Sequence, residues 1–331
     1  MTRFANNMNR FPGNAKFAFS IFDDTDLSTV ENVAPIYTLL GEIGMRTTKS
    51  VWPLASVADA HVGGASLQDP DYLAFVLGLQ RTGFEIALHN VRNICSTRSQ
   101  IKAGLDEFKR LIGHDPRVHT NHAGNRENIY WGPARFSTVA PFYRAMTSLH
   151  RRKFEGHIES SSCFWGDMCR HRIEYVRNFV FREINLYRVN PTMPYRDEQK
   201  PFVNMWFSSS EASDCATFCE LLSEANQDRL EEEHGICIAY THFACDFVRD
   251  GVVHPRVEYL LRRLARKNGW FVPVSSLLDF LRQQHQTTLI PKAELEAMER
   301  EWLLDRVAGT VKEAVRKWRA HPKSKGHRAS A

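Results

Sequence analysis

Short apolar runs alternate with longer segments of helical periodicity along most of this 331-residue chain. A helical segment between two buried strands allows the second strand to return parallel to the first. We predict eight strands, at residues 16–22, 47–52, 85–88, 117–120, 179–184, 203–207, 236–240 and 270–274. We predict helices at residues 30–43, 69–83, 99–111, 214–232 and 255–267, and another that begins after Ser275 or Ser276. Residues 125–174 are expected to form loops with one or two helices.

An open doubly wound sheet and a closed barrel both fit this alternation. No Gly-x-Gly-x-x-Gly or Walker loop follows a predicted strand, which disfavours the nucleotide-binding open sheets. We therefore predict an α/β fold, a distorted (β/α) barrel of seven or eight strands, in residues 1–290. Residues 291–331 are predicted to add a C-terminal helix, at about 292–318, and a disordered basic tail.

The positive charge of the chain is concentrated at its C-terminal end. The 43 basic and 38 acidic residues give a net charge of +5, and residues 311–331 carry seven basic residues against one acid. The rest of the chain is therefore almost neutral, and we expect no nucleic-acid partner for it. No segment reaches the roughly 18 apolar residues of a membrane span. The polar N-terminal segment has no apolar signal core, so we expect a cytoplasmic protein whose seven cysteines stay reduced.

Three carboxylates follow the first predicted strand, at Asp23, Asp24 and Asp26. One interpretation is a helix N-cap with solvated loop acids. The other is functional, because crowded carboxylates at the end of a buried strand are costly unless a cation or a shared proton relieves them. One carboxylate would then bind a metal while its neighbour acts as a base. In a β/α barrel, catalytic groups gather at this end of the strands.

Histidines follow three other predicted strands. His89 follows the third strand, His119 and His122 flank Asn121 after the fourth, and His242 follows the seventh. A lone histidine is more often a structural residue, and the His119–His122 segment could be a polar loop. Four strand ends that each bear Asp or His should nevertheless open on the same mouth of a barrel.

These residues resemble the polysaccharide deacetylase (NodB-homology) family, which are metal-dependent hydrolases on a distorted β/α barrel. Phe22-Asp23-Asp24 matches the family's first motif, with Thr25 in place of the usual Gly. His89 matches the first histidine of the His-[Ser/Thr]-x-x-His motif, whose second histidine is replaced by Asn93. The Arg-Pro-Pro-Tyr-Gly motif is rewritten between Pro116 and Gly124, and Tyr240-Thr241-His242 matches the last motif.

The resemblance implies that Asp23 is the general base, His242 the general acid, and Asp24 and His89 ligands of a divalent metal, with zinc as the candidate. Asn93 would offer only a neutral amide oxygen, a poor ligand for zinc. We expect His119 or His122 to supply the missing imidazole, and His122 is preferred because it lies past the end of its strand.

The resemblance further implies a metal-dependent amide hydrolase that deacetylates an N-acylated amino sugar. Without an export signal, we expect a small nucleotide-linked or lipid-linked sugar as substrate, in surface-polysaccharide biosynthesis such as that of lipopolysaccharide. Asn121, Trp165 and Trp206 are candidates for contacting the sugar, although both tryptophans could equally be core residues. The alternative is an inactive or repurposed barrel that binds carbohydrate without hydrolysing it.

Overall fold

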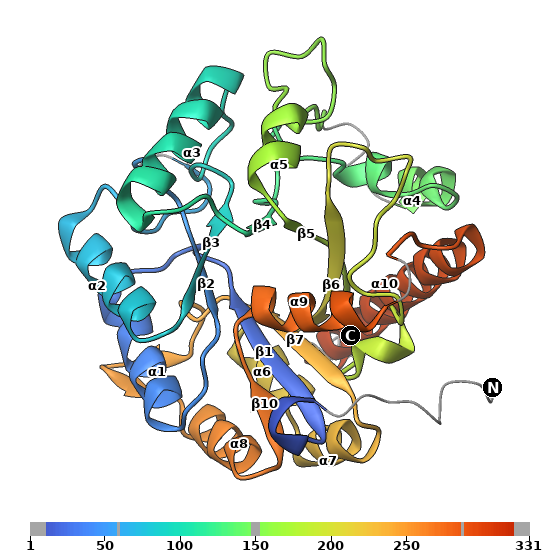
Figure 1. Cartoon of the computed structure of the whole chain (residues 1–331). Helices are drawn as coiled ribbons and strands as arrows, with labels where there is room; N and C mark the ends of the chain where they lie inside the picture. The colour runs from blue at the N-terminus through green and yellow to red at the C-terminus, as the bar shows by residue number, and fades with distance from the viewer. Residues whose placement is uncertain (1–10, 58–59, 147–152, 286–287, 321–331) are drawn as a thin grey trace, which may run out of the picture.

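Seven parallel strands close into a barrel in the computed structural model, which describes residues 11–57, 60–146, 153–285 and 288–320. Each strand from β1 to β7 pairs with the next, and β7 pairs with β1 to complete the ring. An eighth strand, β10, pairs with the N-terminal half of β1. The predicted α/β barrel of seven or eight strands is thus confirmed (Figure 1).

The strands of this sheet are β1 (Phe17–Asp23), β2 (Thr48–Val51), β3 (Glu85–His89), β4 (Val118–Thr120), β5 (Tyr175–Phe181), β6 (Met205–Glu211), β7 (Ile236–Thr241) and β10 (Gly269–Phe271). A separate hairpin joins β8 (Val248–Arg249) and β9 (Val252–Val253). The helices are α1 (Val30–Glu42), α2 (Pro70–Arg81), α3 (Arg98–Ile112), α4 (Ala140–Met146), α5 (Gly166–Arg172), α6 (Cys215–Leu221), α7 (Glu224–Glu232), α8 (Pro255–Ala265), α9 (Val274–Gln284) and α10 (Lys292–Ala320). Three 3-10 turns cover Pro12–Asn14, Gly132–Arg135 and Leu186–Arg188.

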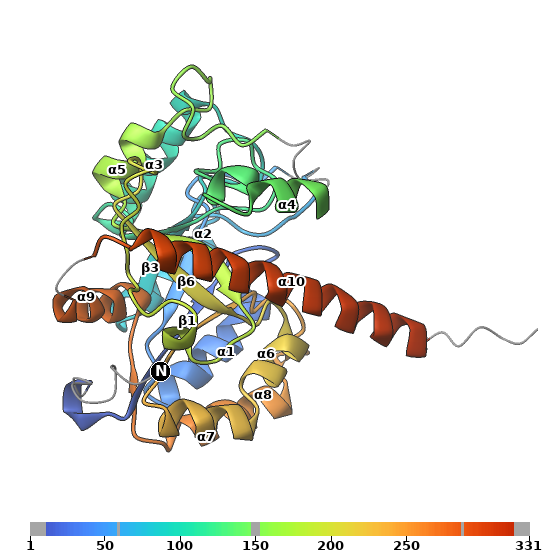
Figure 2. The ribbon, with the colours of Figure 1, turned by 90° about the vertical axis from the view of Figure 1, so that its right-hand side faces the viewer.

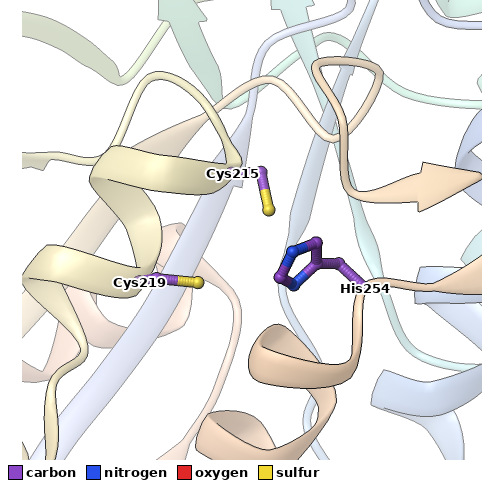
Figure 3. A group of neighbouring side chains, drawn as sticks. All are labelled: Cys215, Cys219 and His254. Carbon is purple, nitrogen blue, oxygen red and sulfur yellow. The ribbon is translucent and has the colours of Figure 1, made fainter.

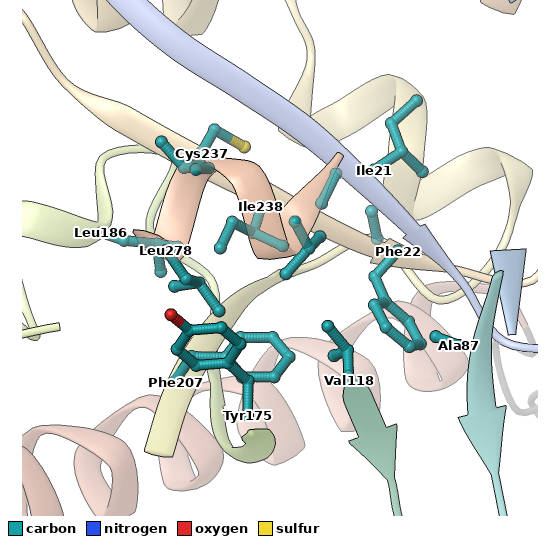
Figure 4. Close-up of a cluster of buried hydrophobic side chains, with 14 of the residues drawn as sticks. Ile21, Phe22, Ala87, Val118, Tyr175, Leu186, Phe207, Cys237, Ile238 and Leu278 are labelled. Carbon is teal, nitrogen blue, oxygen red and sulfur yellow. The ribbon is translucent and has the colours of Figure 1, made fainter. Parts of the chain in front are cut away.

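The barrel core is built from apolar side chains that alternate along the strands. Phe22 of β1, Val118 of β4 and Phe207 of β6 are fully buried and lie near Ile238 of β7 (Figure 4). The rings of Phe22 and Phe207 lie 6.4 Å apart, in a tilted arrangement. Because these side chains fill the barrel, its interior is a packed core rather than a channel. Burying each of them contributes about 1.5–3 kcal/mol to the free energy of folding.

Several predicted boundaries differ from the structure; the sixth strand, for example, covers Met205–Glu211 rather than 203–207. The fifth strand begins at Tyr175, four residues before the predicted start, because the polar residues Arg177 and Asn178 interrupt its apolar pattern although both are buried. The predicted helix at 214–232 is two helices, α6 and α7, with Ser223 as the N-cap residue of the second. The helix after β10 begins at Val274, two or three residues earlier than the sequence indicates.

Helix α9 covers the N-terminal ends of the strands. Its first backbone amide, on Val274, donates to the Thr48 hydroxyl at 2.9 Å, and its Asp279 accepts from Arg117 at 2.8 and 2.9 Å. Because this helix occupies one end of the barrel, the opposite end, where the strands run out, is left for a functional site.

Helix α10 packs along the barrel and then continues beyond it (Figure 2). Its Trp302 is 6% exposed and contacts the rings of Phe136, Tyr143 and Phe179. The division of the chain at residue 290 stays a prediction. The end of the basic tail, at 321–331, lies outside the described residues. Across the described part of the chain, the search for a helix that could cross a bilayer finds none.

Candidate active site

The carboxylate of Asp26 lies among three imidazoles at the C-terminal end of the barrel. Its Oδ1 atom is 3.4 Å from His89 Nε2 and 3.2 Å from His122 Nε2, and its Oδ2 atom is 3.3 Å from His242 Nε2. Burial opposes ionisation of Asp26, but His89 and the other two imidazoles outweigh it and hold the pKa of this carboxyl well below its usual range. Asp26 is therefore an anion at neutral pH.

Three of these atoms have the features of metal ligands. Asp26 Oδ1, His89 Nε2 and His122 Nε2 are buried, and none has a hydrogen-bond partner within the described ranges. They lie within 4.8 Å of one another. A carboxylate and two imidazoles form a ligand set that zinc accepts, with positions left for water and substrate. The residues present therefore fit a divalent cation.

Hydrogen bonds at the opposite ring nitrogens aim both imidazoles at Asp26. His89 Nδ1 lies 2.7 Å from the Thr120 hydroxyl, which donates to Asp24 Oδ1 at 3.3 Å. The hydroxyl proton is therefore used, so His89 donates from Nδ1, and in its neutral form it keeps a lone pair on Nε2. His122 Nδ1 lies 3.1 Å from Asn125 Oδ1, an acceptor, with the same consequence. Such partners fix the tautomer of a metal-binding histidine.

His242 faces the other oxygen of Asp26. Its Nδ1 donates to the backbone carbonyl of Ser213 at 2.7 Å, which leaves Nε2 directed at the carboxylate. Burial lowers the pKa of this imidazole, but Asp26 and Asp24 more than compensate and raise it to about 9. His242 is thus protonated at neutral pH in the absence of a bound cation.

Asp24 forms a buried ion pair with Arg177 of β5. The guanidinium donates two hydrogen bonds to it, at 2.6 and 3.2 Å, and the Arg177 side chain is only 6% exposed. Burial raises the pKa of Asp24, but the charge of Arg177 outweighs this effect and lowers it. Asp24 is ionised, lines the cavity described below, and does not belong to the group of unpartnered ligand atoms around Asp26.

Asp23 lies behind the site, in the wall of the barrel. Both Asp23 and Lys49 are fully buried, and Lys49 Nζ lies 2.8 Å from Asp23 Oδ2. The same carboxylate accepts hydrogen bonds from the Tyr37 hydroxyl and the Phe243 backbone amide, both at 2.9 Å. Three protein groups thus bind this carboxylate, and Asp23 is not among the residues that line the cavity.

A cavity of about 490 Å³ opens beside Asp26, a volume typical of small-molecule sites. Aromatic and charged side chains from distant parts of the chain line it. They include Asp24, Asp26, His89, Asn121, Trp131, Arg135, Tyr143, Arg177, Glu211, Tyr240, Trp302 and Arg306. Helix α10 supplies Trp302 and Arg306, so the C-terminal extension forms part of the candidate site.

His119 and Asn93 lie apart from the cluster around Asp26. The His119 imidazole is fully buried next to Trp165, with ring centroids 5.2 Å apart, and burial lowers its pKa to about 3. The Asn93 amide donates to the carbonyls of Val57 and Val62 and accepts from the Val57 amide. Asn93 therefore holds the loop after β2 in place.

Asn121 lines the cavity, whereas Trp165 and Trp206 do not. The Asn121 amide donates to the backbone carbonyl of Ile129 and accepts from its amide, so its side chain orders the neighbouring loop. Both tryptophans are 1% exposed, and Trp165 Nε1 donates to the Glu127 carbonyl at 2.7 Å. The aromatic walls of the cavity are Trp131, Tyr143, Tyr240 and Trp302 instead.

Sequence reasoning missed several residues of the site. Asp26 belongs to the acidic run that the sequence marks, and its spacing from β1 gave no reason to prefer it over Asp24. Arg177 could not be predicted as a site residue, because a charged residue within a strand interrupts the apolar pattern by which the strand is recognised. Trp302 lies 60 residues beyond His242, on a helix that no local signal connects to the barrel mouth.

A second group with metal-binding side chains lies outside this cavity. Cys215 and Cys219 of α6 lie beside His254, which precedes α8, and their ligand atoms are within 4.8 Å of one another (Figure 3). His254 Nδ1 accepts from the Arg256 backbone amide at 3.2 Å. All seven cysteines are free thiols in the structure, as expected from the sequence.

Comparisons with known proteins find similarity to solved structures alone. The sequence matches no protein-family model and no curated protein sequence. The fold is similar to a structure from Mycobacterium smegmatis described as a polysaccharide deacetylase, with a TM-score of 0.48 and 11% identity over 85% of this chain and 96% of the other. A branching enzyme from Pyrococcus horikoshii has a TM-score of 0.43 and 13% sequence identity; the match covers 83% of this chain and 72% of that enzyme's chain. A peptidoglycan deacetylase from Bacillus subtilis has a TM-score of 0.38 and 12% sequence identity; the match covers 86% of this chain and 97% of the deacetylase chain. Solved structures similar to this chain therefore include polysaccharide and peptidoglycan deacetylases, the family that its motifs resemble.

Proposed function

We propose that this protein is a metal-dependent amide hydrolase that removes the acyl group from an N-acylated amino sugar. The observation that carries the proposal is the convergence of Asp26 Oδ1, His89 Nε2 and His122 Nε2, which are buried and without partners among the described residues. Asp26 and His89 also line the cavity. The motif resemblance and the aromatic cavity wall support a sugar substrate, because aromatic faces suit pyranose rings.

The proposed ligands of the cation are Asp26, His89 and His122. This set keeps two of the residues that the sequence indicates and replaces Asp24 with Asp26. When bound, a divalent cation such as zinc polarises an acyl carbonyl and lowers the pKa of the attacking water.

The proposed general base is Asp24 rather than Asp23. Asp24 is ionised and lines the cavity, and Arg177 fixes its orientation through two hydrogen bonds. Asp23 does not line the cavity, and Lys49, Tyr37 and Phe243 bind its carboxylate from within the protein. Asp24 would accept the proton of the attacking water.

His242 is proposed to protonate the leaving amine. Its Nδ1 proton is held by the Ser213 carbonyl, so the proton on Nε2 is the one available for transfer. A general acid placed across the scissile bond from the base lets the C–N bond break without expelling an amide anion. The amine then leaves neutral, and the acyl group leaves as a carboxylate.

The cellular setting belongs to the proposal as well. A small nucleotide-linked or lipid-linked sugar in the cytoplasm, within surface-polysaccharide biosynthesis such as that of lipopolysaccharide, follows from the sequence analysis alone. A cavity of about 490 Å³ is compatible with a small substrate.

The experiment combines metal analysis with an assay of acyl release. The purified protein, loaded with one equivalent of zinc, is incubated with short N-acetylglucosamine oligosaccharides, and free acetate and free amine are measured together. Equal amounts of both products, lost on chelation and restored by zinc, are expected. A protein that binds zinc but releases neither product from any N-acylated amino sugar would contradict the proposal.

The second candidate function is carbohydrate binding without hydrolysis. One observation favours it: Asp23, which matches the position of the general base in the family's motif, forms a buried ion pair with Lys49. Under this alternative, sugars bind to the cavity and no acyl group is released. The same assay, combined with calorimetry, separates the two functions.

A further inference from the structure

Arg135 is a buried cation in the wall of the cavity. It ends the 3-10 turn Gly132–Arg135, is 6% exposed and lines the same cavity as Asp26. Its guanidinium lies 3.7 Å from the centre of the Trp131 ring and 5.6 Å from that of Trp302. The cation therefore lies between aromatic side chains from two distant segments of the chain.

Two of the three guanidinium nitrogens of Arg135 have no acceptor among the described residues. Its Nε and Nη2 atoms are buried without a hydrogen bond, and no acid among the residues that the structure describes forms an ion pair with it. Cation–π contacts stabilise the face of a guanidinium, whereas its five donors lie in the plane of the group. Burial lowers the pKa of Arg135 to about 9; Tyr143 opposes this shift, and Arg306 and Arg177 add to it. The side chain is still a cation at pH 7.

The other charged groups of the cavity lining are already matched. Arg177 pairs with Asp24 at 2.6 Å, and Arg306 lies 3.2 Å from Glu211. Asp26 faces the imidazoles, where a divalent cation would add further positive charge. Arg135 is thus a positive charge without an acid, inside a cavity that gains positive charge when it is loaded with metal. A buried donor group of this kind is costly unless a ligand completes it.

We infer that the substrate carries an anionic group, a phosphate or a carboxylate on the sugar, and that Arg135 binds it. The inference rests on the proposed function and adds the chemical class of its substrate: an anionic N-acylated amino sugar rather than a neutral one. The planar guanidinium matches the oxygens of either anion with two parallel hydrogen bonds. The aromatic side chains around it fix its plane, which leaves Arg135 pre-organised for the ligand.

Equilibrium binding tests this inference without requiring turnover. Calorimetry compares three probes: N-acetylglucosamine 6-phosphate, N-acetylmuramate, which carries a carboxylate, and neutral N-acetylglucosamine. Each is titrated into zinc-loaded and zinc-free protein, since an anion could also bind to the metal. We expect at least one anionic sugar to bind at least about tenfold more tightly than the neutral sugar in both forms, as charge-assisted hydrogen bonds allow. The two anionic probes distinguish a phosphate site from a carboxylate site.

Variants assign the preference to one side chain. Arg135→Met should reduce the preference for the anionic sugar to less than about threefold, and Arg135→Lys should keep part of it. Arg126→Met is the matched control, because it removes one positive charge from an arginine that pairs with Glu155 at the surface. If Arg135→Met does not fold, as judged by its melting transition, Arg135→Lys decides the question. The inference is overturned if the wild type binds all three probes equally, or if the preference survives in full in Arg135→Met. If that variant does not fold, an undiminished preference in Arg135→Lys overturns the inference. Anion preference without acyl release would count against the proposed hydrolase alone.

Discussion

Two carboxylates that are adjacent in sequence have opposite surroundings. Asp23 faces the barrel wall, where Lys49 Nζ lies 2.8 Å away and both groups are fully buried. Asp24 faces the cavity and pairs with Arg177. Adjacent residues at a strand end point to opposite sides, so one acid can stabilise the barrel while its neighbour contacts substrate.

Asp23→Asn should destabilise the protein, because Lys49 would remain as a buried charge without its partner. Breaking a buried pair in this way costs about 3–5 kcal/mol, measurable as a lower free energy of unfolding in urea. The double variant Asp23→Asn/Lys49→Met should recover part of the loss. A single Asp23→Asn variant that keeps its stability and loses turnover would instead assign the base role to Asp23.

Asp24→Asn should lower kcat by about 10²–10⁴-fold, the usual contribution of a general base. Its zinc content should remain near one per chain, since Asp24 is outside the group of unpartnered ligand atoms. The rate is measured well below the melting temperature, because Arg177 loses its charged partner in this variant. Unchanged turnover would exclude Asp24 as the base.

At the scale of single residues, the sequence indicated the region of the site but not the role of each side chain. The strand ends that carry His89, His122 and His242 could be located from apolar runs alone. The choice between Asp24 and Asp26 depends on Arg177, a residue 153 positions away from Asp24. No local pattern contains that pairing.

At the scale of elements, α9 stabilises the closed end of the barrel through charged groups. Asp279 accepts two hydrogen bonds from Arg117 and one from the Tyr175 hydroxyl, at 2.7–2.9 Å. Burial raises the pKa of Asp279, but the hydrogen bonds and the charge of Arg117 outweigh it and lower the pKa below its ordinary value of 3.8.

Asp279→Asn should therefore destabilise the protein by about 1–2 kcal/mol at pH 7, a value reduced by partial exposure of the group. A carboxyl with a lowered folded-state pKa contributes stability above its unfolded-state pKa and loses it as pH falls through the folded-state value. The difference between wild type and variant should consequently shrink below about pH 4. Urea unfolding at several pH values measures this, with the exposed Asp250→Asn as control. A pH-independent difference would contradict the role of the charge.

Helix α10 is held by Glu299, a fully buried acid that accepts hydrogen bonds from residues 137–139. Four donors reach its carboxylate: the backbone amides of Ser137, Thr138 and Val139 and the Thr138 hydroxyl, at 2.5–3.3 Å. This contact keeps Trp302 and Arg306 against the cavity.

Glu299→Leu should lower the free energy of unfolding by at least about 1–3 kcal/mol, because buried amides lose their acceptor. It should also raise KM more than it lowers kcat, since the helix lines the cavity without carrying a proposed proton-transfer group. Denaturant unfolding and steady-state kinetics measure the two effects. Glu301→Gln on the exposed face of the same helix is the matched control and should change neither.

At the scale of the whole molecule, the barrel could be predicted because each strand and its following helix leave a local pattern. The number of strands and their parallel order are compatible with the observed closure of β7 onto β1, but an open sheet would fit them as well. The contribution of α10 to the cavity could not be predicted, because an amphipathic helix does not specify the surface on which it packs. Trp165 and Trp206, the predicted substrate contacts, are buried and do not line the cavity. Neither the N-cap position of Trp165 nor the strand position of Trp206 specifies from the sequence where the side chain points.

The central claim is that Asp26, His89 and His122 hold one divalent cation. Zinc content and zinc affinity of the wild type and of Asp26→Asn, His122→Asn and His119→Asn test it most directly. We predict one zinc ion per wild-type chain, loss of tight binding in the Asp26 and His122 variants, and full occupancy in the His119 variant. A wild-type protein that binds no divalent metal, or an Asp26 variant that keeps its zinc, would contradict the account.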